Sequence, residues 1–463
     1  MTRILRPFAL VAIAATCALI SATARSQAPA EPPASQQPLP QQPSEVSTTI
    51  TSGASGAPPR FAVPDFIPLS PDPETAAIAK TIGQVLWDDL NFEREFALIP
   101  RDTYATIPPA KSLAEVPFDR WRELNTDGVL IGTVQTVGTT LRVEARLFNM
   151  QTLQSVFGKE YTGSTTNARA YAHTIADEIH QQQRALRGVA RTKLTFNSDR
   201  DGERMTGTVE SRSVKEIYIA DYDGESQRRV TTGRSLNITP TWSPDGRSIA
   251  YTSYRRGPPN IFISNIYQGT LDELTKGPSQ SFLPAWSPDG TRIAFFSTRD
   301  GNSEIYVANR DGSNVRRITN HPSIDSTPTW SPTGTQIAFT SDRTGAPQIY
   351  VIGADGLGLR RITSESYCDR PTWSPAPYNE IAYTSRTGPG NDVKVKDLAS
   401  GQVRQLTFGE GTNESPAFAP NGRHLAFTST RSGRTQVFTI ARDGKNLKQI
   451  TRVGNNYQPD WSK

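Results

Sequence analysis

The chain has 463 residues and a formal net charge of +5, and its Lys and Arg residues are scattered among Asp and Glu. This length is too great for one ordinary core and suggests two or three domains. The small and evenly distributed charge gives little support for nucleic-acid binding, so we expect no nucleic-acid partner.

The first predicted element is a secretory signal peptide over residues 1–24. Arg3 and Arg6 precede an apolar run from Phe8 to Ile20, and the small residues Ala22 to Ala24 form a site of the kind that signal peptidase cleaves. The apolar run of about 13 residues is shorter than the roughly 20 that a membrane-spanning helix needs, and no later segment comes close. We therefore expect an exported protein without direct membrane insertion.

The two cysteines are predicted to carry no disulfide and no lipid. Cys17 lies inside the apolar run, but Thr16 stands where a lipoprotein signal requires Gly, Ala or Ser. Cleavage of the signal peptide leaves Cys368 as the single thiol, so no intramolecular disulfide is possible and stability must come from packing. A buried, inert thiol is favoured over a reactive one.

Residues 25–60 form a predicted flexible segment. Gln27 to Pro43 is a run of Pro, Gln, Ala and Ser with almost nothing to bury, which is typical of a disordered and partly polyproline-like spacer. Such a stretch provides reach but forms no core.

Residues 61–188 have the pattern of a small α/β domain with the order βαβαβββα. "RFAVPDF" indicates a strand, and Asp72 followed by Pro73 is a typical helix start. "FALIP" indicates a strand, "FDRWRELN" a short helix, and the next three segments strands joined by tight turns. The last helix is expected to end at Gly188. The first helix buries a stripe at helical spacing: Ile78, Ile82, Val85, Leu86 and Leu90.

The last helix of this domain contains His173, Asp177 and His180 on one face, which could in principle hold a metal. The buried side of the helix passes through the same region, and the motif is not H-E-x-x-H. We therefore favour a structural role and expect no metal and no cofactor.

From residue 193 to 463 the sequence repeats with a period of about 44 residues, in the range of propeller blades. The unit contains a Pro-aromatic strand, an "SPDG" turn, an apolar central strand such as "RIAFFS", a third strand, an Asp-Gly turn and a charged outer strand. The repeated aromatics are Trp242, Trp286, Trp330, Trp373, Phe418 and Trp461.

The two ends of the repeat are complementary halves of one blade. The central strand at Lys193 has no Pro-Trp strand before it, and the Pro-Trp strand at Pro459 has no central strand after it. Pairing the two halves removes both open sheet edges. We therefore expect a mainly β protein: a six-bladed β-propeller closed by a C-terminal strand and preceded by the α/β domain.

The loops that lead into the inner strands are predicted to meet at one mouth of the central channel, where propellers usually bind ligands. Equivalent positions five residues before each aromatic form a mostly polar ring, although such residues also satisfy loop backbone groups. The ring consists of Asn237, Ser281, Asp325, Cys368, Asn413 and Asn456.

These features together resemble the TolB family, the periplasmic component of the Tol-Pal envelope system. The repeats alone occur in other propellers, but "FAVPDF", "WRELNTDGVLIGTV", "EARLFN" and "AHTIADEIH" occur in the order seen in that family. "EVSTTITSG" at Glu45 resembles the family's short TolA-binding segment. The resemblance implies a periplasmic adaptor that is not an enzyme, links the Pal lipoprotein to TolA, and supports outer-membrane integrity and constriction at cell division.

The resemblance also implies where the partners bind. TolA is expected at residues 45–56, on Glu45, Val46, Ile50, Ser52 and Gly53. Pal is expected at the channel mouth, on Asn237, Ile238, Thr239, Ser281, Phe282, Asp325, Ser326, Asp369, Arg370, Asn413, Glu414 and Tyr457. Two features depart from the family pattern: about twenty residues of spacer precede Glu45, and the first blade carries an enlarged loop, "SDRDGERMTGTVESRSVK".

Two other classes remain as alternatives. A propeller hydrolase is disfavoured because the chain has no G-x-S-x-G motif and no α/β-hydrolase domain after the propeller. A lyase is disfavoured because the propeller contains only His321 and His424, and His424 falls in a central strand. A small-ligand propeller, for carbohydrate or metal, would use Asp325, Asp369 and Glu414.

Overall fold

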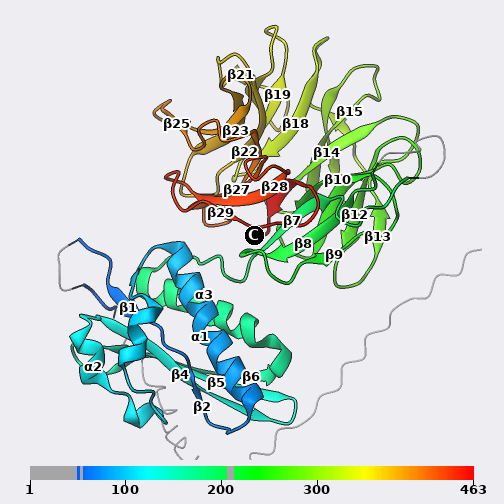
Figure 1. Cartoon of the computed structure of the whole chain (residues 1–463). Coiled ribbons are helices and arrows are strands. Elements are labelled where there is room, and N and C mark those ends of the chain that lie inside the picture. Colours follow the sequence, from blue (N-terminus) through cyan, green and yellow to red (C-terminus); the bar gives the residue numbers. More distant parts are fainter. Residues whose placement is uncertain (1–48, 53–55, 206–212) are drawn as a thin grey trace, which may run out of the picture. The chain divides into compact units, whose positions relative to one another are not determined.

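A computed structural model describes residues 49–52, 56–205 and 213–463 (Figure 1). The predicted signal peptide, Cys17 and most of the flexible segment lie outside the described residues. Ser47–Lys463 is one compact unit and contains both predicted domains.

The α/β domain has the predicted order of elements, with short 3₁₀ turns added. Its sheet has the order β3-β1-β4-β5-β6, with β2 paired to β4. The N-terminal strands pair in parallel, and the β4-β5-β6 meander is antiparallel. "RFAVPDF" contains the single strand β1, as predicted, and the short strand β2 begins directly after it. The elements are β1 (Arg60–Ala62), β2 (Ile67–Pro68), α1 (Pro73–Glu93), β3 (Ala97–Leu98), 3₁₀ turns at Arg101–Thr106, Leu113–Glu115 and Thr165–Asn167, α2 (Phe118–Glu123), β4 (Gly128–Val137), β5 (Thr140–Asn149), β6 (Ser155–Ser164) and α3 (Ala168–Arg184).

The start of α1 is confirmed, whereas the predicted end of α3 is wrong by a few residues. Asp72 accepts a hydrogen bond from the Thr75 backbone N–H at 2.7 Å, and the predicted apolar stripe of α1 is buried. Helix α3 ends at Arg184, because Ala185 takes the left-handed conformation at φ 52°. Gly188 instead permits a close approach: a Cβ there would lie 2.2 Å from a carboxylate oxygen of Asp177.

The propeller consists of six four-stranded antiparallel sheets. The first blade has the order β30-β7-β8-β9, so the C-terminal strand is its inner strand, and Trp461 lies opposite Leu194. In Figure 1 the red C-terminal end accordingly lies beside the green β7. The predicted closure by the C-terminus is confirmed.

Each blade is ordered from its inner edge to its outer edge. The first three blades are β30 (Asn456–Trp461), β7 (Lys193–Ser198), β8 (Glu216–Asp221), β9 (Arg228–Arg229); β10 (Asn237–Trp242), β11 (Ser248–Ser253), β12 (Asn260–Asn265), β13 (Leu271–Glu273); and β14 (Ser281–Trp286), β15 (Arg292–Ser297), β16 (Glu304–Asn309), β17 (Arg316–Arg317). The other three are β18 (Asp325–Trp330), β19 (Gln336–Ser341), β20 (Gln348–Gly353), β21 (Arg360–Arg361); β22 (Cys368–Trp373), β23 (Glu380–Arg386), β24 (Asn391–Asp397), β25 (Val403–Gln405); and β26 (Asn413–Phe418), β27 (His424–Ser429), β28 (Gln436–Ala441), β29 (Lys448–Gln449).

A threonine after each outer strand ties that strand to its blade. In every blade its hydroxyl accepts a hydrogen bond, at 2.8 to 2.9 Å, from a backbone N–H of the third strand. The donor is the second residue of that strand in five blades and the third residue in the fifth blade, where β24 begins one residue earlier. The same hydroxyl donates to the polar side chain at the start of that strand. This double role explains the constant final residue of the repeat: Thr231, Thr275, Thr319, Thr363, Thr407 and Thr451.

Candidate functional site

The six inner strands share an irregular backbone that shapes the central channel. Each pairs with its central strand with a register shift after the second residue, which is a β-bulge. The fourth residue is always proline, which has no N–H to donate and is compatible with a bulge. The third residue is left-handed, with φ between 49° and 55°, in all six strands: Thr239, Leu283, Thr327, Arg370, Ser415 and Gln458.

A left-handed β-branched residue such as Thr239 or Thr327 is unusual, because the Cβ crowds the backbone there. The surrounding side chains compensate. The Thr239 hydroxyl lies 2.9 Å from that of Thr252, and the Thr327 hydroxyl donates to that of Thr340 at 2.6 Å. Hydrogen bonding between inner and central strands therefore holds a conformation that local preference disfavours.

The first residue of each inner strand, which precedes the bulge, lies in the interior. The six positions predicted to form a polar ring are 0 to 3% exposed. Asn237 donates to Glu216 at 2.7 Å, Asn413 donates to Asp392 at 3.0 Å, and Asp325 accepts from Arg343 at 2.8 Å. These side chains therefore satisfy local polar groups, which is the alternative role that the sequence also allowed.

Cys368 is the fifth-blade member of this ring and is fully buried. Burial raises the pKa of its thiol to about 11, so the thiol is protonated at neutral pH. The predicted burial of this thiol is confirmed, and its low reactivity stays a prediction.

The second residue of each inner strand is half-buried and forms the accessible part of the mouth. This second-residue ring consists of Ile238, Phe282, Ser326, Asp369, Glu414 and Tyr457. Of the other predicted residues, Arg370 is also half-buried, whereas Thr239 is 9% exposed.

One side of the second-residue ring is aromatic. Phe282 stacks on Phe296 with ring centroids 4.9 Å apart, and Tyr254 meets Phe282 edge-on at 6.4 Å. At Tyr457, the Lys215 ammonium lies 3.6 Å from the ring centroid. Half-exposed aromatic surface of this kind is enriched where proteins bind proteins.

The other side of the ring carries charges of both signs, already partly paired. Asp369 accepts hydrogen bonds from the Thr340 hydroxyl at 2.9 Å and from the Arg370 backbone N–H at 2.7 Å. Glu414 accepts from the Asn391 amide at 2.7 Å. Burial raises the pKa of Tyr367, beside Asp369, to about 12, so its hydroxyl is a neutral donor. A partner must therefore match a fixed polar pattern.

Below the mouth, a cavity of about 150 Å³ is lined by the third, fourth and fifth residues of the inner strands. Sequence reasoning missed Leu283, Thr327, Ser415 and Gln458 as channel residues, although the position before each proline was a signal. Asp460 accepts from the Trp242 backbone N–H at 2.7 Å, and burial raises the pKa of its carboxyl. Within the described ranges, no three His, Cys, Asp or Glu side chains are grouped to hold a metal ion.

Burial and hydrogen bonds indicate structural roles for the four histidine residues considered in the sequence analysis. His173 hydrogen-bonds Asp89 at 2.8 Å, and His180 donates to the Ala176 carbonyl at 3.0 Å. His424 is 2% exposed in its central strand, and His321 accepts from the Ser323 backbone N–H at 3.1 Å.

Of the predicted TolA-binding residues, Glu45, Val46 and Gly53 lie outside the described residues. Ile50 is packed in the core of the α/β domain: it is 3% exposed, and its backbone N–H donates to Gln183 at 2.8 Å. The Ser52 hydroxyl donates to the Ala57 carbonyl at 2.8 Å. In this conformation the side chain of Ile50 is not accessible to a partner.

Comparisons with known proteins agree with this architecture. A family model described as the TolB beta propeller domain matches residues 184–463, and one described as the TolB amino-terminal domain matches residues 46–156. The crystal structure of TolB from Acinetobacter baumannii is similar to 88% of this chain and 97% of that chain, with a TM-score of 0.73 and 25% identity.

Relatives named "Tol-Pal system protein TolB" are similar over shorter stretches. The one from Pseudomonas putida is 32% identical over 184 residues, covering 36% of this chain and 41% of the relative. The one from Desulfosudis oleivorans is 32% identical over 147 residues, covering 31% and 33%. The matched stretch thus spans about two fifths or less of these curated relatives. Among the helices of the described residues, none has the length and apolar composition to cross a membrane.

Proposed function

Because the chain belongs to the TolB family, we propose that it is a periplasmic, non-enzymatic adaptor that binds the lipoprotein Pal at the propeller mouth and TolA through its N-terminal segment. Family membership makes it a component of the Tol-Pal system. In the proposed role it connects outer-membrane anchoring to an inner-membrane partner, and so supports outer-membrane integrity and constriction during cell division.

The observation that carries the Pal assignment is the second-residue ring. Its side chains are half-buried, combine an aromatic side at Phe282 with a charged side at Asp369 and Glu414, and stand on strands fixed by bulges. Such a surface needs little reorganisation to bind, which favours a protein partner over a small ligand.

The TolA assignment requires the N-terminal segment to be available. Since Ile50 is buried in the α/β core, binding through its side chain would require it to leave that core. The free energy of this step would weaken TolA binding relative to a free segment. Binding through the residues before Thr49 would avoid that cost.

The Pal assignment is tested by binding of purified Pal to a variant with a charge at the mouth. Phe282→Glu should weaken Pal binding at least tenfold, because it places a carboxylate against the Phe296 ring. Leu357→Glu is the matched control: Leu357 is 70% exposed in the turn between β20 and β21. Equal Pal affinities of the two folded variants would contradict the assignment.

The TolA assignment is tested separately by deleting residues 45–48. This deletion should reduce binding of purified TolA and leave Pal binding unchanged, since it removes no residue of the mouth. Loss of both activities, or of neither, would overturn the division of partners between the two sites.

A further inference from the structure

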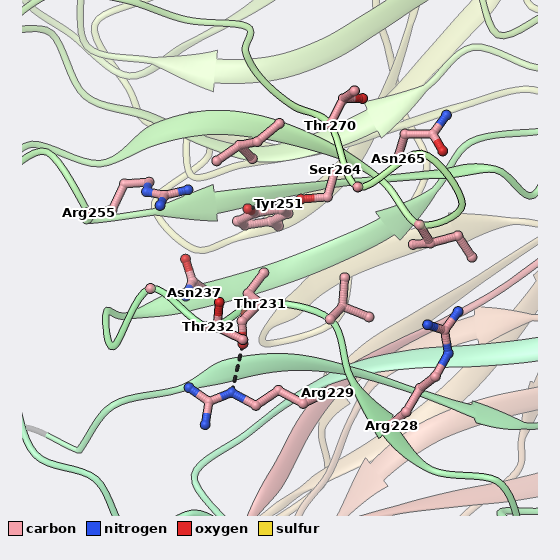
Figure 2. A pocket seen from close by; sticks show the side chains of 15 residues that line it. Arg228, Arg229, Thr231, Thr232, Asn237, Tyr251, Arg255, Ser264, Asn265 and Thr270 are labelled. Atoms are coloured by element: carbon pink, nitrogen blue, oxygen red, sulfur yellow. Dashed lines mark hydrogen bonds between the residues drawn. The ribbon is translucent and has the colours of Figure 1, made fainter.

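A polar pocket of about 250 Å³ lies between the first and second blades (Figure 2). The first blade contributes Arg228, Arg229 and the loop that follows them, and the second blade contributes Tyr251 and Arg255 among others. No Asp or Glu is among the described residues that line the pocket. It is separate from the central channel, whose cavity is lined by the inner strands.

The pocket coincides with a departure from a repeated arginine contact. In four blades the arginine two residues after the central strand donates its Nε to the last serine of that strand, at 2.9 to 3.3 Å. In three of these blades it also donates Nη to the first residue of the inner strand: Arg200 to Asn456 at 2.9 Å, Arg343 to Asp325 at 2.8 Å and Arg431 to Asn413 at 3.0 Å.

Arg255 is the equivalent arginine of the second blade, and it makes neither contact. Among the described residues, its guanidinium donates no hydrogen bond to Ser253 or to Asn237. Instead it faces the loop of the first blade, where a Cβ on Gly233 would lie 3.6 Å from its Nη2. Figure 2 shows Arg255 beside Tyr251 on one side of the pocket, with Asn237 and Thr232 facing them.

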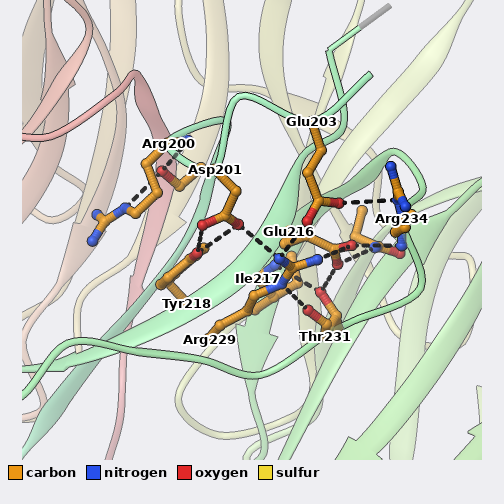
Figure 3. A network of polar contacts seen from close by, with 11 residues as sticks. Arg200, Asp201, Glu203, Glu216, Ile217, Tyr218, Arg229, Thr231 and Arg234 are labelled. Atoms are coloured by element: carbon orange, nitrogen blue, oxygen red, sulfur yellow. Dashed lines mark hydrogen bonds and ion pairs between the residues drawn. The ribbon is translucent and has the colours of Figure 1, made fainter. Parts of the chain in front are cut away.

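A dense polar network fixes the first-blade side of the pocket (Figure 3). Arg229 donates to Asp201 at 2.9 Å, to Glu203 at 3.1 Å and to Glu216 at 2.8 Å, so its charge is neutralised within the protein. Glu216 also accepts from the Asn237 amide nitrogen at 2.7 Å. This bond fixes the orientation of the Asn237 amide and leaves its oxygen without a donor among the described residues.

The charges that remain for a ligand are those of Arg255 and Arg228. Both side chains are exposed, and neither forms an ion pair with an acidic side chain in the described part of the chain. A guanidinium presents a planar fork of N–H groups that matches a carboxylate or a phosphate. The pocket therefore carries positive charge that no acidic side chain of the described residues balances, and it favours an anionic ligand.

The rest of the lining is rich in groups that bind hydroxyls. Thr232, Ser264, Asn265 and Thr270 all border the pocket, together with the Asn237 amide. The volume is slightly below the roughly 300–1,000 Å³ of sites for drug-sized ligands, so the pocket suits a ligand with one ring. We propose that it binds a hydroxylated anion of monosaccharide size, a sugar acid or a sugar phosphate, with Arg255 as the anion contact. This site is independent of the proposed partner binding.

The test uses titration calorimetry on the purified, exported chain with glucose 6-phosphate, glucuronate, glucose and inorganic phosphate. At least one of the two sugar anions should bind more tightly than glucose and than phosphate, and which one binds distinguishes phosphate from carboxylate recognition. No binding of either sugar anion up to about 10 mM, or equal binding of neutral glucose, would overturn the proposal. Phosphate binding as tightly as glucose 6-phosphate would overturn the part that concerns hydroxyl groups.

Two variants and one control locate the binding. Arg255→Met should reduce the affinity at least tenfold by removing the anion contact. Gly233→Met should do the same by filling the pocket while Arg255 is retained, since a Cβ at Gly233 makes only ordinary contacts. Arg299→Met, at the equivalent position of the third blade, where Nε is bonded to Ser297, should bind like the wild type. If Arg255→Met and Arg299→Met lose affinity equally, the proposed site is wrong.

Discussion

The indole N–H of Trp461 donates a hydrogen bond to the Thr192 hydroxyl at 2.7 Å. Next to this pair, the backbone N–H groups of Ser462 and Lys193 donate to the Lys193 carbonyl and the Ser462 hydroxyl respectively, each at 2.8 Å. The end of the chain is thus bonded to the residues that begin the first central strand. This is the closure of the propeller, and it involves an aromatic side chain that is 3% exposed.

Trp461→Ala should destabilise the propeller by about 3–5 kcal/mol, the usual cost of truncating a buried aromatic. Deleting residues 459–463 should destabilise the propeller more than Trp461→Ala, because the deletion also exposes the inner edge of β7 and promotes aggregation. Thermal unfolding measures both effects. Thr192→Val removes the hydrogen bond from the Trp461 indole and the one that the Thr192 hydroxyl donates to the Val189 carbonyl, and it should cost about 1–3 kcal/mol. An unchanged midpoint for the deletion would show that the ring is closed in another way.

The thiol of Cys368 should react slowly with a thiol reagent such as DTNB in the native protein. It is fully buried, and burial raises the pKa of the thiol to about 11, which keeps the reactive thiolate scarce at pH 8. In denaturing urea the same thiol should react at the rate of a free cysteine. Rapid reaction of the folded protein would contradict the buried position.

The repeat made much of this fold predictable. The Pro-aromatic strand, the turns and the two unmatched ends together determine six blades and the strand that closes them. The sequence did not distinguish the accessible residue of the inner strand: Asn237 and Ile238 were both expected at the mouth, whereas Asn237 is buried and Ile238 is half-buried. The bulge between residues 238 and 241 was also not predicted. A bulge adds a residue to one strand and changes which side chains share a face.

The site between the blades illustrates the same limit. Arg255 and Arg343 follow their central strands in the same way, as "SYR" and "SDR", so the sequence gives them the same role. In the structure Arg343 is bonded to Asp325, whereas Arg255 is turned toward Gly233. Differences of this kind depend on the loop of the neighbouring blade, which is not part of the repeat unit that contains the arginine.

The threonine after each outer strand offers a test of the repeated hydrogen bonds. Thr363 accepts from the Ile349 N–H at 2.8 Å and donates to Gln348 at 2.9 Å, and it is 3% exposed. Thr363→Val leaves a buried N–H without its partner and should cost about 1–3 kcal/mol, measured by urea unfolding. Thr363→Ser retains the hydroxyl and should cost clearly less. Equal losses for the two variants would assign the effect to packing rather than to hydrogen bonding.

His180 should make the α/β domain sensitive to acid. The imidazole is 1% exposed in α3, and burial is the main reason that its pKa is lowered to about 4, with the positive charges of Arg423 and Arg184 acting in the same direction. In the unfolded chain the pKa is about 6.5, so protons bind more tightly to the unfolded state. The stability that the neutral imidazole contributes is complete above pH 6.5 and is lost as the pH falls toward 4.

Between pH 7 and pH 5 this linkage should lower the free energy of unfolding by about 2 kcal/mol, from 1.36 kcal/mol for each pH unit below 6.5. His180→Leu removes the titrating group at nearly constant volume, at the cost of the hydrogen bond to the Ala176 carbonyl. The variant should therefore be less stable at pH 7 yet lose less stability on acidification. Urea unfolding at both pH values measures this difference. If the wild type and the variant lose the same free energy of unfolding between pH 7 and pH 5, His180 is not the group responsible.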